Sequence, residues 1–186
     1  MKMKMFALAA LMSVATFASA QSVSVGYADR ALKTGAQEHQ TSLSVKTASY
    51  GAFTGDVAFA AVQNDSTNAI TNRTEVGVTY GLGLPLGLKG ETRLATGWKG
   101  KSGSDVTTYY VVEPSVTAKL GATPLSVKVG YRVREAYDNA VADSSRTTRL
   151  AVAYDLTKKD KISLGRDVQT GDGALTQTSL QYTRSF

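Results

Sequence analysis

The chain has 186 residues, with 21 Lys and Arg against 15 Asp and Glu, one His, three Pro and no Cys. This length suits one domain, and the lack of Cys excludes disulfides, thiolate metal sites, iron–sulfur clusters and a cysteine nucleophile. Beyond the first twenty residues no apolar run approaches the roughly 18 residues that a spanning helix needs, which excludes a helical membrane protein.

The first twenty residues have the three parts of a secretory signal. Lys2 and Lys4 provide a basic start, an apolar run follows over residues 5–15, and the segment ends in small residues at 18–20. An N-terminal anchor fits less well because the apolar run is too short to span a membrane. We therefore expect residues 1–20 to be a cleaved signal peptide and residues 21–186 to form the folded domain. Removal of Lys2 and Lys4 lowers the formal net charge from +6 for the whole chain to +4 for this domain.

From Gln21 onward, apolar residues alternate with small or charged ones, a period of two that indicates half-buried β-strands rather than helices. In residues 88–98 the two faces carry different side chains, namely Leu88, Leu94 and Trp98 against Lys89, Glu91 and Arg93. The same pattern predicts ten strands, centred on residues 23–27, 43–45, 57–61, 76–80, 88–98, 110–116, 125–133, 150–154, 162–164 and 180–186.

The connections between these segments are expected to alternate between long polar loops and tight turns. The aromatic residues on the apolar faces then fall into two groups by height, a distribution that membrane interfaces favour and a soluble sandwich does not require. We expect interface aromatics at both ends, namely Tyr27, Trp98, Tyr110 and Tyr131 at the long-loop end and Tyr80, Tyr154 and Tyr182 at the tight-turn end.

The signal-like start, the ten amphipathic segments and the last segment together resemble a bacterial outer-membrane β-barrel protein of small, porin-like size. In that class the final strand alternates apolar residues and ends in an aromatic, which the barrel-assembly machinery reads as an assembly signal. Leu180, Tyr182 and Phe186 match this pattern, and Arg184 departs from it. The resemblance implies the outer membrane of a Gram-negative bacterium, with outer-membrane lipid and the assembly machinery as partners and both termini periplasmic.

The resemblance implies an all-β fold, a transmembrane antiparallel up-and-down barrel of about ten strands. About 17 residues are available per strand and its connection, against roughly 9 to 11 needed to cross the membrane. Eight strands with longer loops remain the alternative, reached if the weak segments at 41–49 and 162–169 are not strands.

With the apolar face outward, many charged residues point inward, because charge in the middle of the lipid face is costly. Seven of them are the expected lumen-lining residues: Lys89, Glu91, Arg93, Glu113, Lys128, Arg132 and Arg149. The same face carries Lys46, Asp56, Arg73, Glu75, Lys119, Arg134, Asp155 and Asp167. Two cross-strand pairs are expected, Glu113 with Arg132 and Glu75 with Arg93.

Two functions fit this lumen. The first is a narrow porin-like channel for passive passage of small solutes or ions, in which Arg93, Lys128, Arg132 and Arg149 favour anions. The alternative is a plugged structural or surface-interaction barrel without transport. The small inward residues fit both, since they leave open space or let arginine side chains lie flat.

No enzyme is predicted. His39 is the only imidazole, and although Glu38 and Ser42 are near in sequence, this spacing supplies neither an orienting partner nor oxyanion donors, so no catalytic residue is assigned. No cofactor or metal is expected, because the Gly-rich run at 81–87 lies between strands and Asp172 alone cannot form a calcium site. The basic residues form no stripe for nucleic acid. Pro114 within a strand predicts a bulge, and the oligomeric state is left open.

Overall fold

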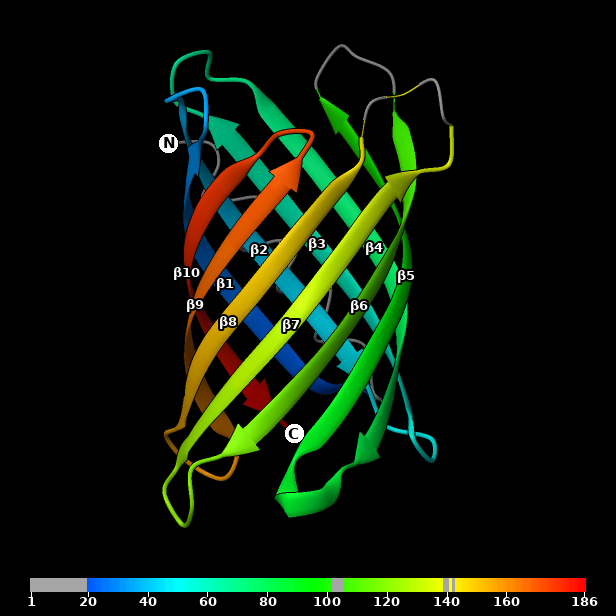
Figure 1. Cartoon of the computed structure of the whole chain (residues 1–186), viewed down its shortest axis with the longest axis vertical. Coiled ribbons are helices and arrows are strands. Elements are labelled where there is room, and N and C mark those ends of the chain that lie inside the picture. The colour runs from blue at the N-terminus through cyan, green and yellow to red at the C-terminus, as the bar shows by residue number, and fades with distance from the viewer. Residues whose placement is uncertain (1–19, 102–105, 139–140, 142) are drawn as a thin grey trace.

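The computed structural model describes residues 20–101, 106–138, 141 and 143–186. Ten antiparallel strands form a closed barrel in which each strand pairs with its sequence neighbours and β1 pairs with β10 (Figure 1). The strands are β1 (Ala20–Leu32), β2 (Gln37–Thr47), β3 (Phe53–Asn64), β4 (Ile70–Gly83), β5 (Lys89–Lys101), β6 (Thr107–Lys119), β7 (Leu125–Ala136), β8 (Ser145–Asp155), β9 (Asp160–Gly171) and β10 (Leu175–Ser185), with one short 3₁₀ turn, η1 (Pro85–Gly87).

The expected ten-stranded up-and-down barrel is therefore confirmed. The eight-strand alternative is wrong, because the two weak segments become β2 and β9, and each of these pairs along its length with both neighbouring strands. Every strand is 11 to 14 residues long, which meets the requirement for crossing a membrane. No helix among the described residues is long and apolar enough to span a membrane.

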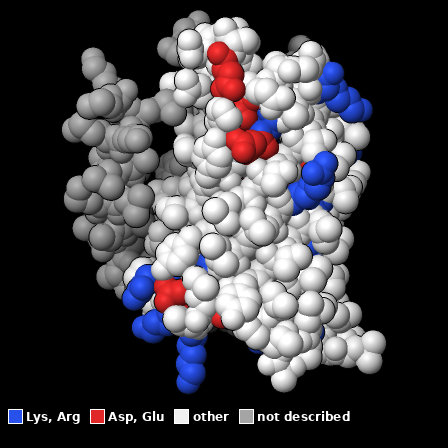
Figure 2. Space-filling model, turned by 90° about the vertical axis from the view of Figure 1, so that its left-hand side faces the viewer, with Lys and Arg blue, Asp and Glu red and all other residues white. Residues whose placement is uncertain are grey.

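Most apolar side chains of the barrel lie outside and most of the charged side chains of its middle part lie inside, with Arg166 on the outer face of β9 as an exception. Leu94 and Leu164 on the outer face are 57% and 62% exposed, whereas Asp56 and Glu75 on the inner face are 6% and 8% exposed. In the face that Figure 2 shows, charged side chains gather toward the two ends and a band between them is almost free of charge. This distribution is the reverse of a soluble barrel and suits a lipid environment.

The two ends of the barrel are distinguished by the chain ends. The amide of Phe186 donates to the carbonyl of Gln21 over 3.0 Å, so both lie at one end, which we call the terminal end. The β1–β2 and β7–β8 connections, among others, lie at the opposite end, which we call the loop end (Figure 1). The expected signal peptide lies outside the described residues, except for Ala20, which begins β1.

The expected alternation of long loops and tight turns is wrong. The connections at the loop end have three to eight residues and those at the terminal end four to five, and only residues 137–144 form a longer loop. The polar stretches that suggested loops are largely the ends of strands, since a β-ladder continues through backbone hydrogen bonds whatever the side chains are. Arg30 and Glu38, for example, pair directly across β1 and β2.

The expected bulge at Pro114 is also wrong. The pairing of β6 with β7 has the same register before and after the proline, from Val112 opposite Val133 to Ser115 opposite Gly130. On its other side, Pro114 lies opposite Thr92 of β5. The proline thus removes a ladder hydrogen bond without displacing the strand.

The seven expected interface aromatics all lie on the outer face and are 37% to 46% exposed. Trp98 and Tyr110 lie close to the loop-end limits of β5 and β6, whereas Tyr27 and Tyr131 lie five residues inside the limits of β1 and β7. At the terminal end, the ring of Tyr80 lies 5.2 Å from that of Phe53. Tyr154 and Tyr182 are one and three residues from the terminal-end limits of β8 and β10.

Candidate functional site

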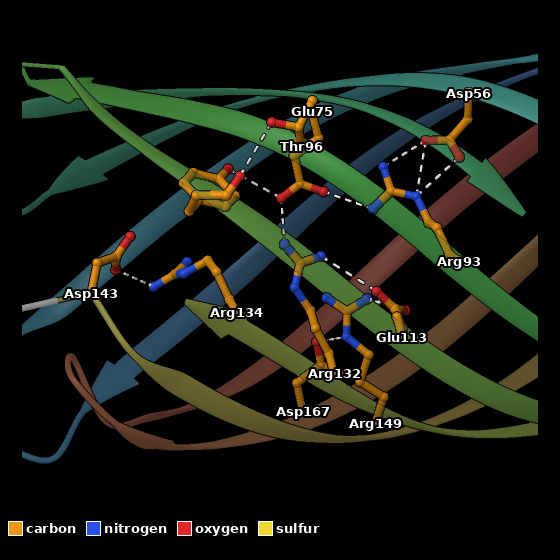
Figure 3. A network of polar contacts seen from close by, with 11 residues as sticks. Asp56, Glu75, Arg93, Thr96, Glu113, Arg132, Arg134, Asp143, Arg149 and Asp167 are labelled. Carbon is orange, nitrogen blue, oxygen red and sulfur yellow. Dashed lines mark hydrogen bonds and ion pairs between the residues drawn. The ribbon is translucent and has the colours of Figure 1, made fainter. Parts of the chain in front are cut away.

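The middle of the lumen holds a chain of ion pairs, which we call the central network (Figure 3). Seven successive strands, β3 to β9, contribute one residue each: Asp56, Glu75, Arg93, Glu113, Arg132, Arg149 and Asp167. Three arginines alternate in space with four carboxylates. Most partners lie on adjacent strands or one strand further, and Arg132 of β7 reaches Glu75 three strands away on β4. The network therefore runs along the barrel wall from β3 to β9.

Each arginine of the network contacts two carboxylates. The guanidinium of Arg93 donates through Nη2 to Asp56 over 2.6 Å and through Nη1 to Glu75 over 2.8 Å. Arg132 donates through Nη2 to the other oxygen of Glu75 and lies 3.4 Å from Glu113. Such charge-assisted contacts are stronger than neutral hydrogen bonds and fix the orientation of the side chains.

Arg149 completes the network at β8. Its Nη1 donates to Glu113 over 2.6 Å, and its Nε lies 3.3 Å from a carboxylate oxygen of Asp167. The three arginines are therefore neutralised by their neighbours. With three arginines and four carboxylates the network has a formal charge of −1, so it presents no net positive charge to a mobile ion in the middle of the lumen.

A glycine lets the network lie flat against the wall. A Cβ on Gly77 would stand 3.0 Å from Nε of Arg93, so the absence of a side chain makes room for the guanidinium. At this position the small inward residue accommodates an arginine, which is one of the two roles expected for these residues.

The remaining strands, β10, β1 and β2, present small or neutral side chains at the same depth, and we call this surface the neutral wall. Its residues are Gly26, Ala28, Gln40, Ser42, Ser44, Gln177, Ser179 and Gln181. Together with the network they line a cavity of 410 Å³ to which all ten strands contribute. At the depth of the central network the lumen is thus charged on one side and neutral on the other.

The terminal end of the lumen is rich in exposed lysine side chains. Nζ of Lys89 and Nζ of Lys128 each lie 2.8 Å from Glu91, and their side chains are 64% and 42% exposed. Lys46 lies on the same inner face and is exposed, with no ion pair within the described part of the chain. Three lysines against one glutamate leave a local excess of positive charge.

The loop end of the lumen is tightly filled. Tyr109 and Val111 of β6 are 0% and 1% exposed, and the Tyr109 hydroxyl donates to Glu75 over 3.1 Å. The guanidinium of Arg134 lies over the Tyr109 ring, 5.5 Å from its centroid. Asp143 reaches in from the loop after β7 and is 2% exposed.

The structure brings the sequence-predicted lumen residues together as follows. Six of the seven line the cavity, and Lys89 joins them through Glu91. Glu113 and Arg132 form the expected pair. Glu75 and Arg93 also pair, but the expected register between β4 and β5 is wrong: Glu75 lies opposite Gly97 and Arg93 opposite Thr79. The long arginine side chain spans the four-residue offset.

Several lumen residues lie outside the strand segments that the sequence predicts. They are Arg30, Glu38, Lys99, Tyr109 and Asp143. The first four continue the period of two of their strands, so a longer assignment of each strand would have found them. Asp143 lies in a loop, and no periodicity could have indicated it.

His39 lies on the outer face, away from the lumen. Its Nδ1 lies 2.7 Å from Asp29 and 2.8 Å from the hydroxyl of Tyr27, and its Nε2 lies 3.1 Å from Asp65. Glu38, its neighbour in sequence, instead points inward to Arg30. The contacts of His39 are thus two carboxylates and a phenol, which is not an arrangement of base and serine nucleophile.

Comparison with known proteins supports the fold. No family model matches the chain, and no curated protein matches it in sequence. Among solved structures, KdgM porin has a TM-score of 0.53 and 14% identity over 88% of this chain and 99% of its own. The COG4313 outer membrane channel from Pseudomonas putida F1 has a TM-score of 0.54 and 11% identity over 90% of this chain and 96% of its own.

A third similar structure is the translocator domain of autotransporter NalP from Neisseria meningitidis, with a TM-score of 0.55 and 9% identity over 100% of this chain and 95% of its own. These proteins differ in function and share the barrel. The chain therefore has the fold of an outer-membrane β-barrel, and its function has to be argued from its own lumen.

Proposed function

We propose that the protein is a bacterial outer-membrane barrel that passes small solutes or ions through a narrow, anion-favouring lumen. Both chain ends then lie on the periplasmic side, with lipid around the apolar belt and the barrel-assembly machinery acting on the last strand. The observation that carries the proposal is the polar cavity of 410 Å³ to which every strand contributes. A barrel that only anchors a surface has no need of such a space.

The expected preference for anions over cations depends on which positive side chains in the lumen have no carboxylate partner. The arginines of the central network are neutralised by carboxylates, so they contribute little long-range field. Lys46 at the terminal end and Arg73 toward the loop end have no ion pair among the described residues. In a narrow lumen with low-dielectric walls, such charges raise the local concentration of anions.

The conductance should be small. Tyr109 and Val111 are buried at the loop end, and Arg134 and Asp143, which are also buried, form an ion pair there. An ion on this path keeps little of its hydration shell. Passage is therefore proposed for small species only.

The test is single-channel recording of the refolded chain 21–186 in a planar bilayer, with a salt gradient across it. We expect small discrete current steps and a reversal potential that favours anions. Lys46→Glu should reduce the anion preference, because it reverses an exposed charge inside the lumen. Lys158→Glu is the matched control: it makes the same change in the exposed β8–β9 turn at the same end and should leave the preference unaltered.

A plugged barrel is the second candidate, and the burial of the loop-end residues favours it. Silence in the bilayer from protein that circular dichroism shows to be folded would contradict the channel and support this alternative. Currents with no anion preference, or with equal effects of the two lysine variants, would contradict the proposed source of selectivity.

A further inference from the structure

Three arginines meet inside the loop-end half of the lumen, and we call them the arginine cluster: Arg30 of β1, Arg73 of β4 and Arg134 of β7. All three line the cavity. Arg30 and Arg134 are 3% and 4% exposed. Arg134 and Arg30 lie close enough to Arg73 for their positive charges to repel it.

Two members of the cluster are paired with carboxylates. Nη1 of Arg30 lies 2.6 Å from Glu38, and Nη2 of Arg134 lies 2.7 Å from Asp143. Asp143 is shared, since Nζ of Lys99 lies 2.6 Å from the same oxygen. Two acids therefore face four cations when Arg73 is included.

Arg73 is the unpaired member. Its Nε is buried without a hydrogen-bond acceptor, and over the described ranges its guanidinium makes no ion pair. The Nε atoms of Arg30 and Arg134 are likewise buried without an acceptor. Arginine cannot lose its proton in a protein, so this charge has to be compensated by an anion or remain as a cost to the fold.

We propose that the arginine cluster is a binding site for a small carboxylate solute, with Arg73 as its principal ligand. The planar guanidinium suits a carboxylate, which it can bind through two parallel hydrogen bonds. Glu38 and Asp143 show that this part of the lumen already holds carboxylates against arginine. The cavity reaches the cluster beside Ala28, Gln40 and Ala60, whose side chains carry no charge.

The site goes beyond the proposed function because it predicts retention of a solute and a preference for one chemical group. It rests on that function only for the route by which the solute arrives. Binding is measured at equilibrium and requires no current, so the two proposals can fail separately.

The experiment is a calorimetric titration of the refolded chain with gluconate in a low-chloride buffer, with glucose as the neutral comparison and phosphate as the rival oxyanion. We expect saturable binding of gluconate, no binding of glucose, and weaker binding of phosphate. Arg73→Gln should weaken gluconate binding at least tenfold, whereas Arg73→Lys, which keeps the charge, should weaken it less.

Arg166→Gln is the matched control, because it removes an arginine from the outer face, where residue 166 lies between Leu164 and Val168. It should bind gluconate as the original protein does. Tighter binding of phosphate than of gluconate would overturn the carboxylate assignment, and equal binding by the Arg73→Gln variant and the original protein would overturn the site.

Thermal unfolding provides a second readout that does not depend on calorimetry. Gluconate should raise the Tm of the original protein and of the Arg166→Gln variant, but not that of Arg73→Gln. Without gluconate, Arg73→Gln should be at least as stable as the original, because it removes an uncompensated buried charge. A marked loss of stability in this variant would show that Arg73 is already compensated and would contradict the proposal.

Discussion

Gly97 of β5 and Tyr109 of β6 face each other across the ladder, and the phenol ring occupies the space that a side chain on Gly97 would need. A Cβ at position 97 would stand 2.8 Å from Cζ of Tyr109 and 2.8 Å from the backbone oxygen of Thr74. The filled loop end of the lumen, including the bond from Tyr109 to Glu75, thus depends on a residue without a side chain.

Gly97→Ala should therefore destabilise the barrel by about 1–3 kcal/mol, because the backbone contact with Thr74 cannot be relieved by rotating a side chain. The measurement is denaturant unfolding in detergent micelles, followed by circular dichroism. Gly100→Ala on the same strand is the control, since its Cβ would meet only Val106 at 3.4 Å. Equal losses in the two variants would contradict the close packing of Tyr109.

Glu113→Gln should be among the most destabilising single changes in the lumen. It removes the carboxylate that Arg132 and Arg149 share, so each of these partly buried arginines loses one of its two negative partners. The free energy of unfolding should fall by about 3–5 kcal/mol. Asp155→Asn breaks an exposed pair with Lys161 and should cost at most about 1 kcal/mol. The same unfolding assay compares them, and a loss below that of Asp155→Asn would mean that the network contributes no stability.

Adjacent residues of β9 should respond oppositely to the same substitution. Leu164→Arg places a charge on the outer face, where the leucine is 62% exposed, and should cost about 2–4 kcal/mol in a bilayer. Ser163→Arg points into the cavity and should be tolerated. Reversible unfolding from lipid vesicles measures both, and similar costs would show that the faces of β9 have been assigned wrongly.

Phe186 tests the assembly signal separately from stability. The side chain is 69% exposed on the outer surface, so Phe186→Ala should refold in detergent as the original does. In cells its membrane yield should fall severalfold if the assembly machinery reads the terminal aromatic. Tyr50→Ala removes another aromatic at the same end, 90% exposed, and should assemble normally. Unchanged yield of the Phe186 variant would contradict the signal.

The fold could be predicted because one physical constraint governs every strand. Successive side chains alternate between lipid and lumen, so residues such as Leu88 to Trp98 reveal both faces from sequence alone. Strand ends could not be predicted, because backbone pairing continues where the side chains become polar. For example, the polar residues 37–40 lie outside the segment expected at 43–45 and yet belong to β2.

The sequence predicts which residues face the lumen but not which of them form ion pairs with one another. The period of two places Arg93 and Glu75 inside, yet it does not distinguish registers that differ by an even number of residues. Which charges remain uncompensated depends on those contacts. Arg93 is paired twice and Arg73 not at all among the described residues, and their sequence environments do not distinguish them.

The seam between β1 and β10 joins Ser22 to Ser185, residues from opposite ends of the folded chain. Its eleven pairs therefore have the largest sequence separation in the molecule, and their loop-closure entropy has to be overcome before the ladder can form. Until the last strand has been synthesised, every partly made barrel keeps two open sheet edges that can pair with other chains. The tenth strand must be synthesised before closure, so the nascent protein needs protection from aggregation during that interval.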